Sequence, residues 1–308
     1  MNVIEWLCRG DDTVQRLTKK YLCDEPVDTQ DSGFIKRHLD AFDSERALFG
    51  GGLYGPKWIS TQYTLLELVD MEADPNSAVF QSAVHTLRNR LWPKWMKKGV
   101  YHIDLCIAGM LLKVFSYAKT GRQEAEEIID YIMMFQMRDG GWNCRLEGDK
   151  KPNCSSVHTT INVLEGLLAY THTSWQYKKN ECVKAMESGS EVLLERQLFH
   201  QKGTNIPLQA HMTKAHFPPR WKYDYLRALV WFADKKHPAD ERMKPAFELL
   251  YKQMEKGRML RGTAISGKRR FSLENEHYGR FNTLRALKVL KQYDQSTYDK
   301  IIAMSIAE

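Results

Sequence analysis

The sequence predicts an all-α fold built from helical hairpins, on three observations. Strand signals are almost absent, because no long stretch of alternating β-branched residues occurs and no Asn-Gly pair joins two apolar runs. Apolar residues recur at helical spacing along much of the chain. One pattern also appears five times: a polar or aromatic lead-in followed by an apolar helix. With 308 residues, 43% of them hydrophobic, the chain can bury a large core.

The five repeated helices are expected to be the most deeply buried elements. Each carries leucines at fixed offsets and little polar surface, as is typical of helices covered on most sides. In chain order they are KWISTQYTLLELV (57–69), YHIDLCIAGMLLKV (101–114), SVHTTINVLEGLLAY (156–170), RWKYDYLRALVWF (220–232) and GRFNTLRALKVL (279–290).

The intervals between these segments each hold one more helix, with a polar and an apolar face. The stretch EAEEIIDYIMMFQM is acidic where a helix would begin, and DERMKPAFELLYKQMEKG ends in Gly257, a suitable helix cap. The four predicted helices cover residues 77–91, 122–136, 178–199 and 240–256.

The alternation of helix types indicates how the hairpins assemble. A helix that is apolar all round must be covered on both sides, and an inner ring wrapped by an outer ring achieves this. We therefore predict an (α/α)6 toroid, a double ring of helical hairpins, as a single domain over residues 1–308. Segment 1–30 is helical but does not match the repeat, so it is either a cap or a set of outer helices. An open superhelical solenoid is the alternative.

Charge and cysteine content narrow the function classes. The net charge of +7 comes from mixed acidic and basic residues, and no run of Lys and Arg exceeds three, so nucleic acid is not an expected partner. The six cysteines form no CxxC pair. The N-terminal residues lack a signal-peptide pattern, and no apolar run is long enough for a membrane span. We expect a cytoplasmic protein with free thiols and no transmembrane segment.

The stretch FQMRDGGWNCR, residues 135–145, reads as a turn. Asp139, Gly140 and Gly141 end a helix, and Trp142 fills a gap in the core while its indole N–H needs an acceptor.

These features resemble the α/α-toroid superfamily of squalene and terpene cyclases and protein prenyltransferase β subunits. The similarity extends from about Leu48 to Leu290 and is closest to bacterial squalene-cyclase-like proteins without an assigned reaction. It rests on LFGGGLYGPKWISTQYTLLEL, QMRDGGWNCR, HTTINVLEGLLAY and FNTLRALKVL. The Gln136 to Trp142 stretch resembles the repeated Gln-Trp motif of that family, which is structural.

The resemblance also implies a metal site. Protein prenyltransferases hold zinc with an Asp-x-Cys pair on one inner helix and a His on the next, and Asp104, Cys106 and His158 match in type and order. Cys144 and Cys154 lie in the loop before His158 and are spare ligands. Without a metal, Cys106 is a small buried apolar residue, and Asp104 and His158 cap their helices. The Asp-x-Asp-Asp motif of alkene-protonating cyclases is absent from the sequence.

Charged and aromatic residues gather at the lead-ins, where a closed ring would direct them to one rim. Asp224, between two tyrosines, is a candidate proton donor or base, and Cys106 is the second catalytic candidate. Arg220, Lys222 and Lys268 to Arg270 are further cations near the rim. The residues predicted to bind the substrate are Trp58, Tyr63, Tyr101, Trp142, Trp221 and Tyr223 through their rings, and Lys97, Lys98 and Arg280 through charge.

Three functions remain open from the sequence. The first is a prenyltransferase-like or terpene-cyclase-like enzyme with an apolar, aromatic cavity for an isoprenoid, assisted by zinc. The second is an (α/α)6-barrel enzyme that acts on carbohydrate with two carboxylates, for which Asp104 and Asp224 are the pair. The third is a non-catalytic helical-repeat protein that binds a partner, which the sequence does not identify.

Overall fold

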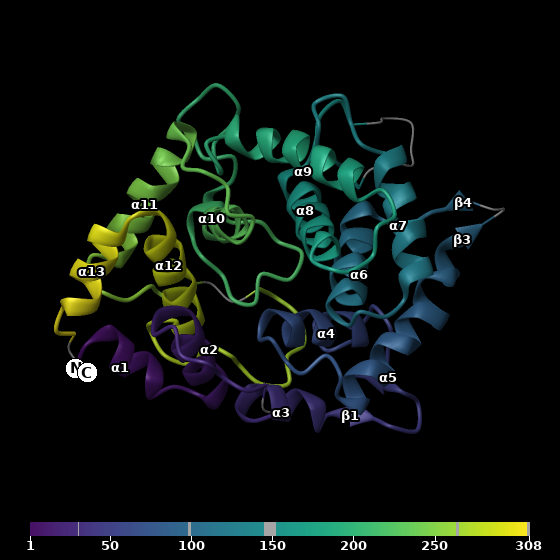
Figure 1. Ribbon diagram of the computed structural model, residues 1–308, viewed down its shortest axis with the longest axis horizontal. Helices are drawn as coiled ribbons and strands as arrows, with labels where there is room; N and C mark the ends of the chain where they lie inside the picture. The colour runs from purple at the N-terminus through teal and green to yellow at the C-terminus, as the bar shows by residue number, and fades with distance from the viewer. Residues whose placement is uncertain (30, 98–99, 145–151, 263–264, 307–308) are drawn as a thin grey trace.

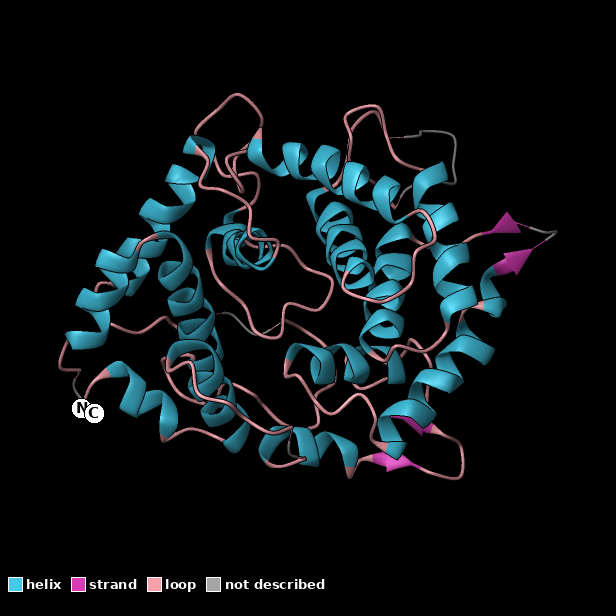
Figure 2. Cartoon of the chain, viewed as in Figure 1, coloured by secondary structure: helices cyan, strands magenta, loops and turns pink. Residues whose placement is uncertain are grey.

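The fold is all-α, as predicted. The computed structural model describes residues 1–29, 31–97, 100–144, 152–262 and 265–306. Over these residues the chain forms α-helices α1 to α13 and two hairpins of very short strands (Figure 2). Strand β1 (Phe42–Asp43) pairs with β2 (Leu48–Phe49), and β3 (Met96–Lys97) pairs with β4 (Val100–Tyr101), both antiparallel.

Six helices lie toward the centre of the molecule (Figure 1). Five of them correspond to the repeated apolar segments, and most of their side chains are buried. They are α2 (Asp12–Leu22), α4 (Thr61–Asp70), α6 (Leu105–Tyr117), α8 (Val157–Thr171), α10 (Tyr225–Asp234) and α12 (Arg280–Tyr293).

The remaining α-helices lie outside this set (Figure 1). Those in the four predicted intervals begin and end within a few residues of the expected positions. The outer helices are α1 (Val3–Cys8), α3 (Gly33–Leu39), α5 (Ala78–Thr86), α7 (Arg122–Met134), α9 (Lys179–Leu194), α11 (Lys244–Met254) and α13 (Gln295–Ala303). A π-helical turn, Leu87–Leu91, continues α5, and short 3-10 turns occur at Pro93–Trp95, Ala210–Thr213 and Glu241–Met243.

Helices α6 and α8 approach one another closely because each contributes a glycine to the contact. A Cβ atom on Gly109 would lie 2.5 Å from the carbonyl oxygen of Asn162. A Cβ atom on Gly166 would lie 2.4 Å from the carbonyl oxygen of Gly109. Both distances are far below van der Waals contact, so the two backbones pack at a separation that only glycine permits.

The Asp-Gly-Gly-Trp turn is built as the sequence indicates. Trp142 is fully buried, and its indole N–H donates to the carbonyl of Ile132 at 2.9 Å. Gly140 has a φ of +93°, in the region that favours glycine. The Gln136 amide donates to the carbonyl of Gly140 at 2.7 Å. The turn therefore fixes the chain between α7 and α8.

The two ends of the described chain lie side by side (Figure 1). The N–H of Ile306 donates to the carbonyl of Met1 at 2.9 Å. Segment 1–30 divides between the two sets of helices, because α1 contacts outer helix α13 while α2 packs on inner helix α12. Assignment of this arrangement to the (α/α)6 toroid class stays a prediction.

Candidate functional site

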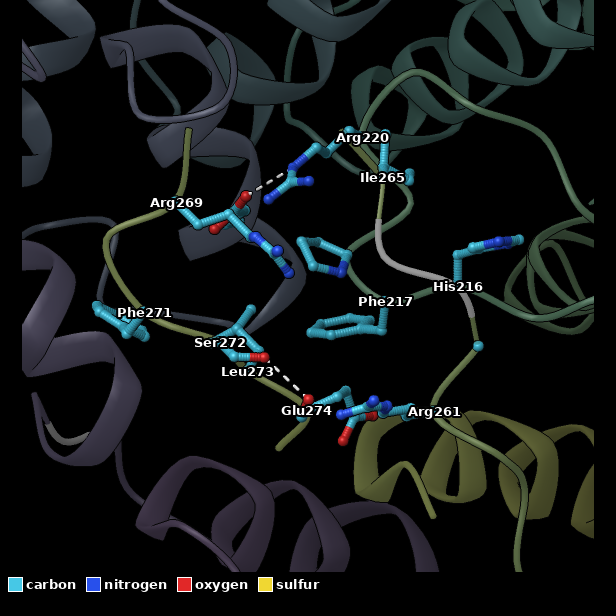
Figure 3. Close-up of a pocket in the computed structure, with 13 residues that line it drawn as sticks. His216, Phe217, Arg220, Arg261, Ile265, Arg269, Phe271, Ser272, Leu273 and Glu274 are labelled. Carbon is cyan, nitrogen blue, oxygen red and sulfur yellow. Dashed lines mark hydrogen bonds and ion pairs between the residues drawn. The ribbon is translucent and has the colours of Figure 1, made fainter. Parts of the chain in front are cut away.

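A cavity of about 470 Å³ lies among the loops near the centre of the molecule (Figure 3). Helix α4 contributes Glu67, and the loop before α10 contributes the segment from His216 to Arg220. The loop before α12 contributes residues between Arg261 and Glu274. The wall thus combines charged residues with Phe217, Ile265 and Phe271, and it differs from the apolar, aromatic cavity that the sequence predicts.

Glu67 lies at the buried end of this cavity. Only 5% of the residue is exposed, and Arg220 Nε donates to its carboxylate at 3.0 Å. The ring of His38 approaches the other carboxylate oxygen at 3.4 Å. Burial raises the pKa of Glu67 to about 7, although Arg220 acts in the opposite direction. A carboxyl group with this pKa can exchange a proton near neutral pH.

Arginine side chains supply most of the charge on the cavity wall. Arg220 is buried against Glu67, and Figure 3 shows Arg269 directed into the cavity toward it. Burial lowers the pKa of Arg220, and the nearby charge of Arg269 adds to that effect. Arg261 and Arg269 are both exposed to solvent. The cavity is therefore suited to an anion that enters from solvent.

Glu274 also lines the cavity, but its contacts are structural. Its carboxylate accepts the N–H groups of Arg280 and Phe281 at 2.9 Å and that of Asn282 at 3.3 Å. These groups form the first turn of α12, so Glu274 caps that helix.

A second cavity of about 470 Å³ adjoins the first, because His216 and Ile265 line both. His211, Lys214 and Lys222 contribute further basic groups to its wall. The two cavities together offer room for an extended ligand, with His216 at their junction.

His216 is paired with Asp224. Its Nδ1 lies 3.6 Å from the Asp224 carboxylate, and only 7% and 1% of the two residues are exposed. The same carboxylate accepts the backbone N–H of Arg227 at 2.8 Å and so caps α10. Arg285 donates to the His216 carbonyl at 3.0 Å. Asp224 thus holds a helix end and also faces the imidazole of His216 through Nδ1, and Nε2 is the second nitrogen of that ring.

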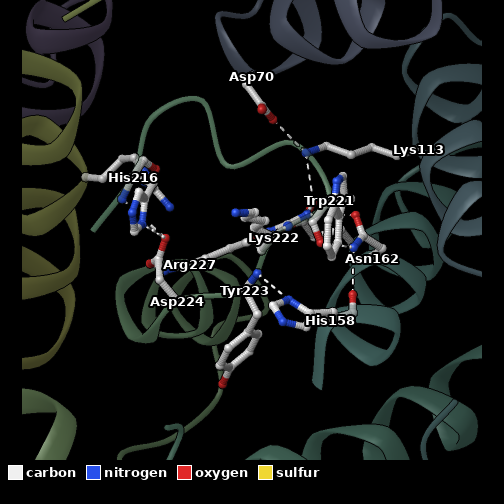
Figure 4. A network of polar contacts seen from close by, with 12 residues as sticks. Asp70, Lys113, His158, Asn162, His216, Trp221, Lys222, Tyr223, Asp224 and Arg227 are labelled. Atoms are coloured by element: carbon white, nitrogen blue, oxygen red, sulfur yellow. Dashed lines mark hydrogen bonds and ion pairs between the residues drawn. The ribbon is translucent and has the colours of Figure 1, made fainter. Parts of the chain in front are cut away.

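A row of ion pairs, buried at Arg227 and half-buried at its other members, runs across four inner helices (Figure 4). Lys113 of α6 binds Asp70 of α4 at 2.7 Å and Glu165 of α8 at 3.0 Å. Arg227 of α10 donates to both carboxylate oxygens of Glu165 at 2.6 and 3.0 Å. Burial alone would raise the pKa of Glu165, but Arg227 and Lys113 outweigh it and lower that pKa to about 2. The sequence alone does not indicate this row, because its members lie on four separate helices.

His158 lies near the start of α8 and holds the loop before α10. Its Nδ1 accepts the backbone N–H of Tyr223 at 2.9 Å, and its ring contacts Trp221 and His211 (Figure 4). Burial lowers the pKa of His158 to about 4, and neighbouring His211, Arg227 and Lys222 contribute to the shift. The structure does not bring His158 into the group formed by Asp104 and Cys106.

Asp104 and Cys106 are joined instead by Cys144. One donor atom from each residue lies within 4.8 Å of the others. Cys144 Sγ accepts the backbone N–H of Cys106 at 3.2 Å and the hydroxyl of Thr159 at 3.1 Å. A hydrogen bond from the Cys106 thiol lowers the pKa of Cys144, while the same bond and burial raise the pKa of Cys106.

The aromatic residues predicted to bind substrate have mostly structural contacts. Trp58 donates to the carbonyl of Ser266 at 2.7 Å and lies edge-on to buried Tyr63 at 4.8 Å. Tyr223 is buried, and its hydroxyl donates to the carbonyl of Leu198. Trp221 is half-buried beside His158. Trp142 belongs to the core, and none of these five rings is among the described residues that line the two cavities.

The structure describes the side chains of only some of the basic residues that the sequence predicts to bind substrate. Arg280 pairs with Glu276 and lies over the ring of Trp6, so its guanidinium faces α1. Lys98 lies outside the described residues, and for Lys97 and Tyr101 only the backbone of the β3–β4 hairpin is described. Arg220, Lys222 and Arg269, also noted from the sequence, do line the cavities.

Comparison with known proteins gives little further information. No protein-family model matches the sequence, and no curated protein matches it. One solved structure with a similar arrangement is described as a polysaccharide lyase; it is 11% identical, with a TM-score of 0.39 over 80% of this chain and 74% of the other. A likeness this weak carries no argument about function. No helix among the described residues is long and apolar enough to cross a membrane.

Proposed function

We propose that this protein binds an acidic carbohydrate across its two central cavities and cleaves it by acid–base chemistry. The observation that carries the proposal is the set of three arginines in the same cavity wall as Glu67 and His216. Arginine binds carboxylates through paired hydrogen bonds. The carboxyl group of Glu67 and the imidazole of His216 are groups that can transfer protons.

The character of the wall favours a sugar over an isoprenoid. A prenyl chain needs a largely apolar pocket, whereas charged or polar side chains line much of the wall of both cavities here. Hydroxyl groups of a sugar would find donors and acceptors in this wall. The adjoining cavities suit neighbouring sugar units, and the apolar surface of Phe217 and Phe271 suits a ring face.

The pair of carboxylates proposed from the sequence is replaced by a different pair of groups. Asp224 caps α10 beside His216, and Asp104 lies with the cysteines. In the revised scheme His216, at the junction of the cavities, removes the proton on the carbon beside the substrate carboxylate. The C–H electrons form a carbon–carbon double bond as the adjacent C–O bond breaks. Glu67 is the candidate that returns a proton to the departing oxygen, while arginines neutralise the carboxylate.

Binding and turnover with uronate oligosaccharides test the proposal. Calorimetry should detect a uronate oligosaccharide but not a neutral one of equal length. The variant Arg269→Ala should bind at least about tenfold more weakly, a loss of about 1.4 kcal/mol. His216→Gln should still bind the oligosaccharide. Its rate of forming the unsaturated product, followed as the increase in ultraviolet absorbance, should fall by about a hundredfold or more.

The matched control is Arg46→Ala, because the Arg46 side chain is 72% exposed on the β1–β2 hairpin. It should leave both binding and turnover unchanged. Tighter binding of a prenyl diphosphate than of any acidic oligosaccharide would overturn the proposal in favour of the isoprenoid function.

A further inference from the structure

We propose that Asp104, Cys106 and Cys144 form a zinc site at the adjacent starts of α6 and α8. The site lies apart from the proposed carbohydrate site, since none of the three residues lines either cavity. It also differs from the ligand set that the family resemblance implies, because Cys144 takes the place of His158.

The backbone places the three donors together before any metal binds. Asp104 is the N-cap residue of α6, and Cys106 lies in the first turn of that helix. Cys144 follows Trp142 by two residues, and Trp142 is anchored in the core by its indole N–H. The carbonyl of Trp142 also accepts the N–H of Ser156, just before α8, at 2.8 Å. The structural turn therefore determines where the sulfur of Cys144 lies.

The chemistry of the donors fits zinc. Two cysteine sulfurs and one carboxylate are ligands that Zn²⁺ accepts, and sulfur selects against Mg²⁺ and Ca²⁺. Three protein ligands leave one position for water, as in zinc sites that act on a bound molecule. On binding, each thiol exchanges its proton for a sulfur–zinc bond, and the protons go to solvent.

The surroundings fit the charge that the bound site would carry. Two thiolates, one carboxylate and Zn²⁺ sum to one negative charge, and the starts of α6 and α8 favour negative charge. The backbone N–H of Cys106 and the hydroxyl of Thr159 both donate to Cys144 Sγ. Hydrogen bonds of this kind orient a metal ligand and stabilise it as a thiolate.

The histidine that the family resemblance implies as a ligand is already engaged. His158 Nδ1 accepts the N–H of Tyr223, and its ring lies against His211 and Trp221. Moving this imidazole to the cysteines would break the contact that holds the loop before α10. The proposed site therefore does not include His158, and metal binding by a His158 variant can distinguish the two ligand sets.

Metal content of the purified full chain tests the proposal. Protein isolated under reducing conditions should contain about one zinc per chain by mass spectrometry. Cobalt in place of zinc should produce the sulfur-to-cobalt absorption bands of thiolate ligation. Cys144→Ser and Asp104→Asn should each lower zinc affinity at least tenfold, with circular dichroism reporting that the helices remain.

Three controls separate this site from its alternatives. His158→Gln and Cys154→Ser should retain zinc, since neither residue belongs to the set. Arg269→Ala should also retain zinc, so failure of the carbohydrate proposal would not affect this one. Zinc lost in His158→Gln but kept in Cys144→Ser would overturn the ligand set. Folded wild-type protein that binds neither metal, or that carries a Cys106–Cys144 disulfide in its place, would overturn the site.

Discussion

The imidazole of His158 is kept neutral by its surroundings. Burial is the main reason that its pKa falls from 6.5 to about 4, and three neighbouring basic residues add to the effect. The unfolded chain therefore binds more protons than the folded protein between these two pH values. Stability from this residue is complete above pH 6.5 and is lost progressively as the pH falls toward 4.

Substitution of His158 by Gln should flatten this pH dependence. The Gln side chain keeps an acceptor for the N–H of Tyr223 but does not titrate. Urea unfolding of wild type and His158→Gln from pH 4 to pH 8 measures the effect, as the difference in the free energy of unfolding. The variant should lose less stability than wild type on acidification; equal pH profiles would contradict the assigned pKa.

Glu165 is the residue on which the row of largely buried ion pairs depends most. It binds Lys113 and Arg227, whose side chains are 18% and 3% exposed. Glu165→Gln would leave both cations without their shared carboxylate, and loss of one partner from a buried pair costs about 3–5 kcal/mol. Chemical denaturation should show a loss of this size.

An exposed ion pair provides the comparison for Glu165. Glu276 binds Arg280 through a side chain that is 53% exposed. Glu276→Gln should cost less than about 1 kcal/mol, because solvent screens such pairs. Similar losses in the two variants would mean that the row of ion pairs contributes no more than a surface pair.

At the scale of elements, the glycines between α6 and α8 are the most sensitive contact. Gly109→Ala places a methyl group against the backbone of α8, and the two helices must move apart to accept it. Overpacking of this kind costs about 1–3 kcal/mol. The urea midpoint should fall accordingly. Gly55→Ala is the control, since a Cβ atom there meets nothing within 4 Å, and it should change stability by less than about 0.5 kcal/mol.

The sequence was informative about helices and less informative about the cavity wall. Helical periodicity located five of the inner helices and four of the outer ones, since burial on one face or all faces leaves a repeating pattern. Apart from Glu67 of α4, the described residues of the cavity wall belong to loops 199–224 and 255–279, where no periodicity exists. Arg220 and Arg269 could be noted as cations near the rim. The role of His216 depends on its distance from Asp224 and could not be read from the chain.

The candidate metal ligands also show how far proximity in space can be predicted from the sequence. Asp104 and Cys106 lie in one helix start, so their proximity follows from sequence. Cys144 and His158 both lie between α7 and the first turn of α8, and the sequence left both open as ligands. Only the path of the turn after Trp142 distinguishes them. The resemblance in residue order therefore pointed to the region of the proposed site, whereas the choice of Cys144 as the proposed third ligand depends on the structure.

For the whole molecule, the adjacent ends allow a test of whether the contacts between the first and last helices depend on the order of the chain. Met1 and Ile306 are hydrogen-bonded, and α2 packs on α12. A circular permutant that joins the ends by a short glycine–serine linker and opens at exposed Gly203 should fold. Circular dichroism should match wild type, and one cooperative transition should remain. A permutant opened within α6 should fail to fold, because the cut interrupts the packing of α6 on α8.

The row of ion pairs from Asp70 to Arg227 has a consequence for the axial alignment of the helices. A slide of one inner helix by a single turn, about 5.4 Å, would separate a buried charge from its partner. Helices α4, α6, α8 and α10 are thereby held in a fixed register along their axes. The loops that precede these helices are consequently held in fixed positions relative to one another, so that distant parts of the chain can present side chains to the same small volume.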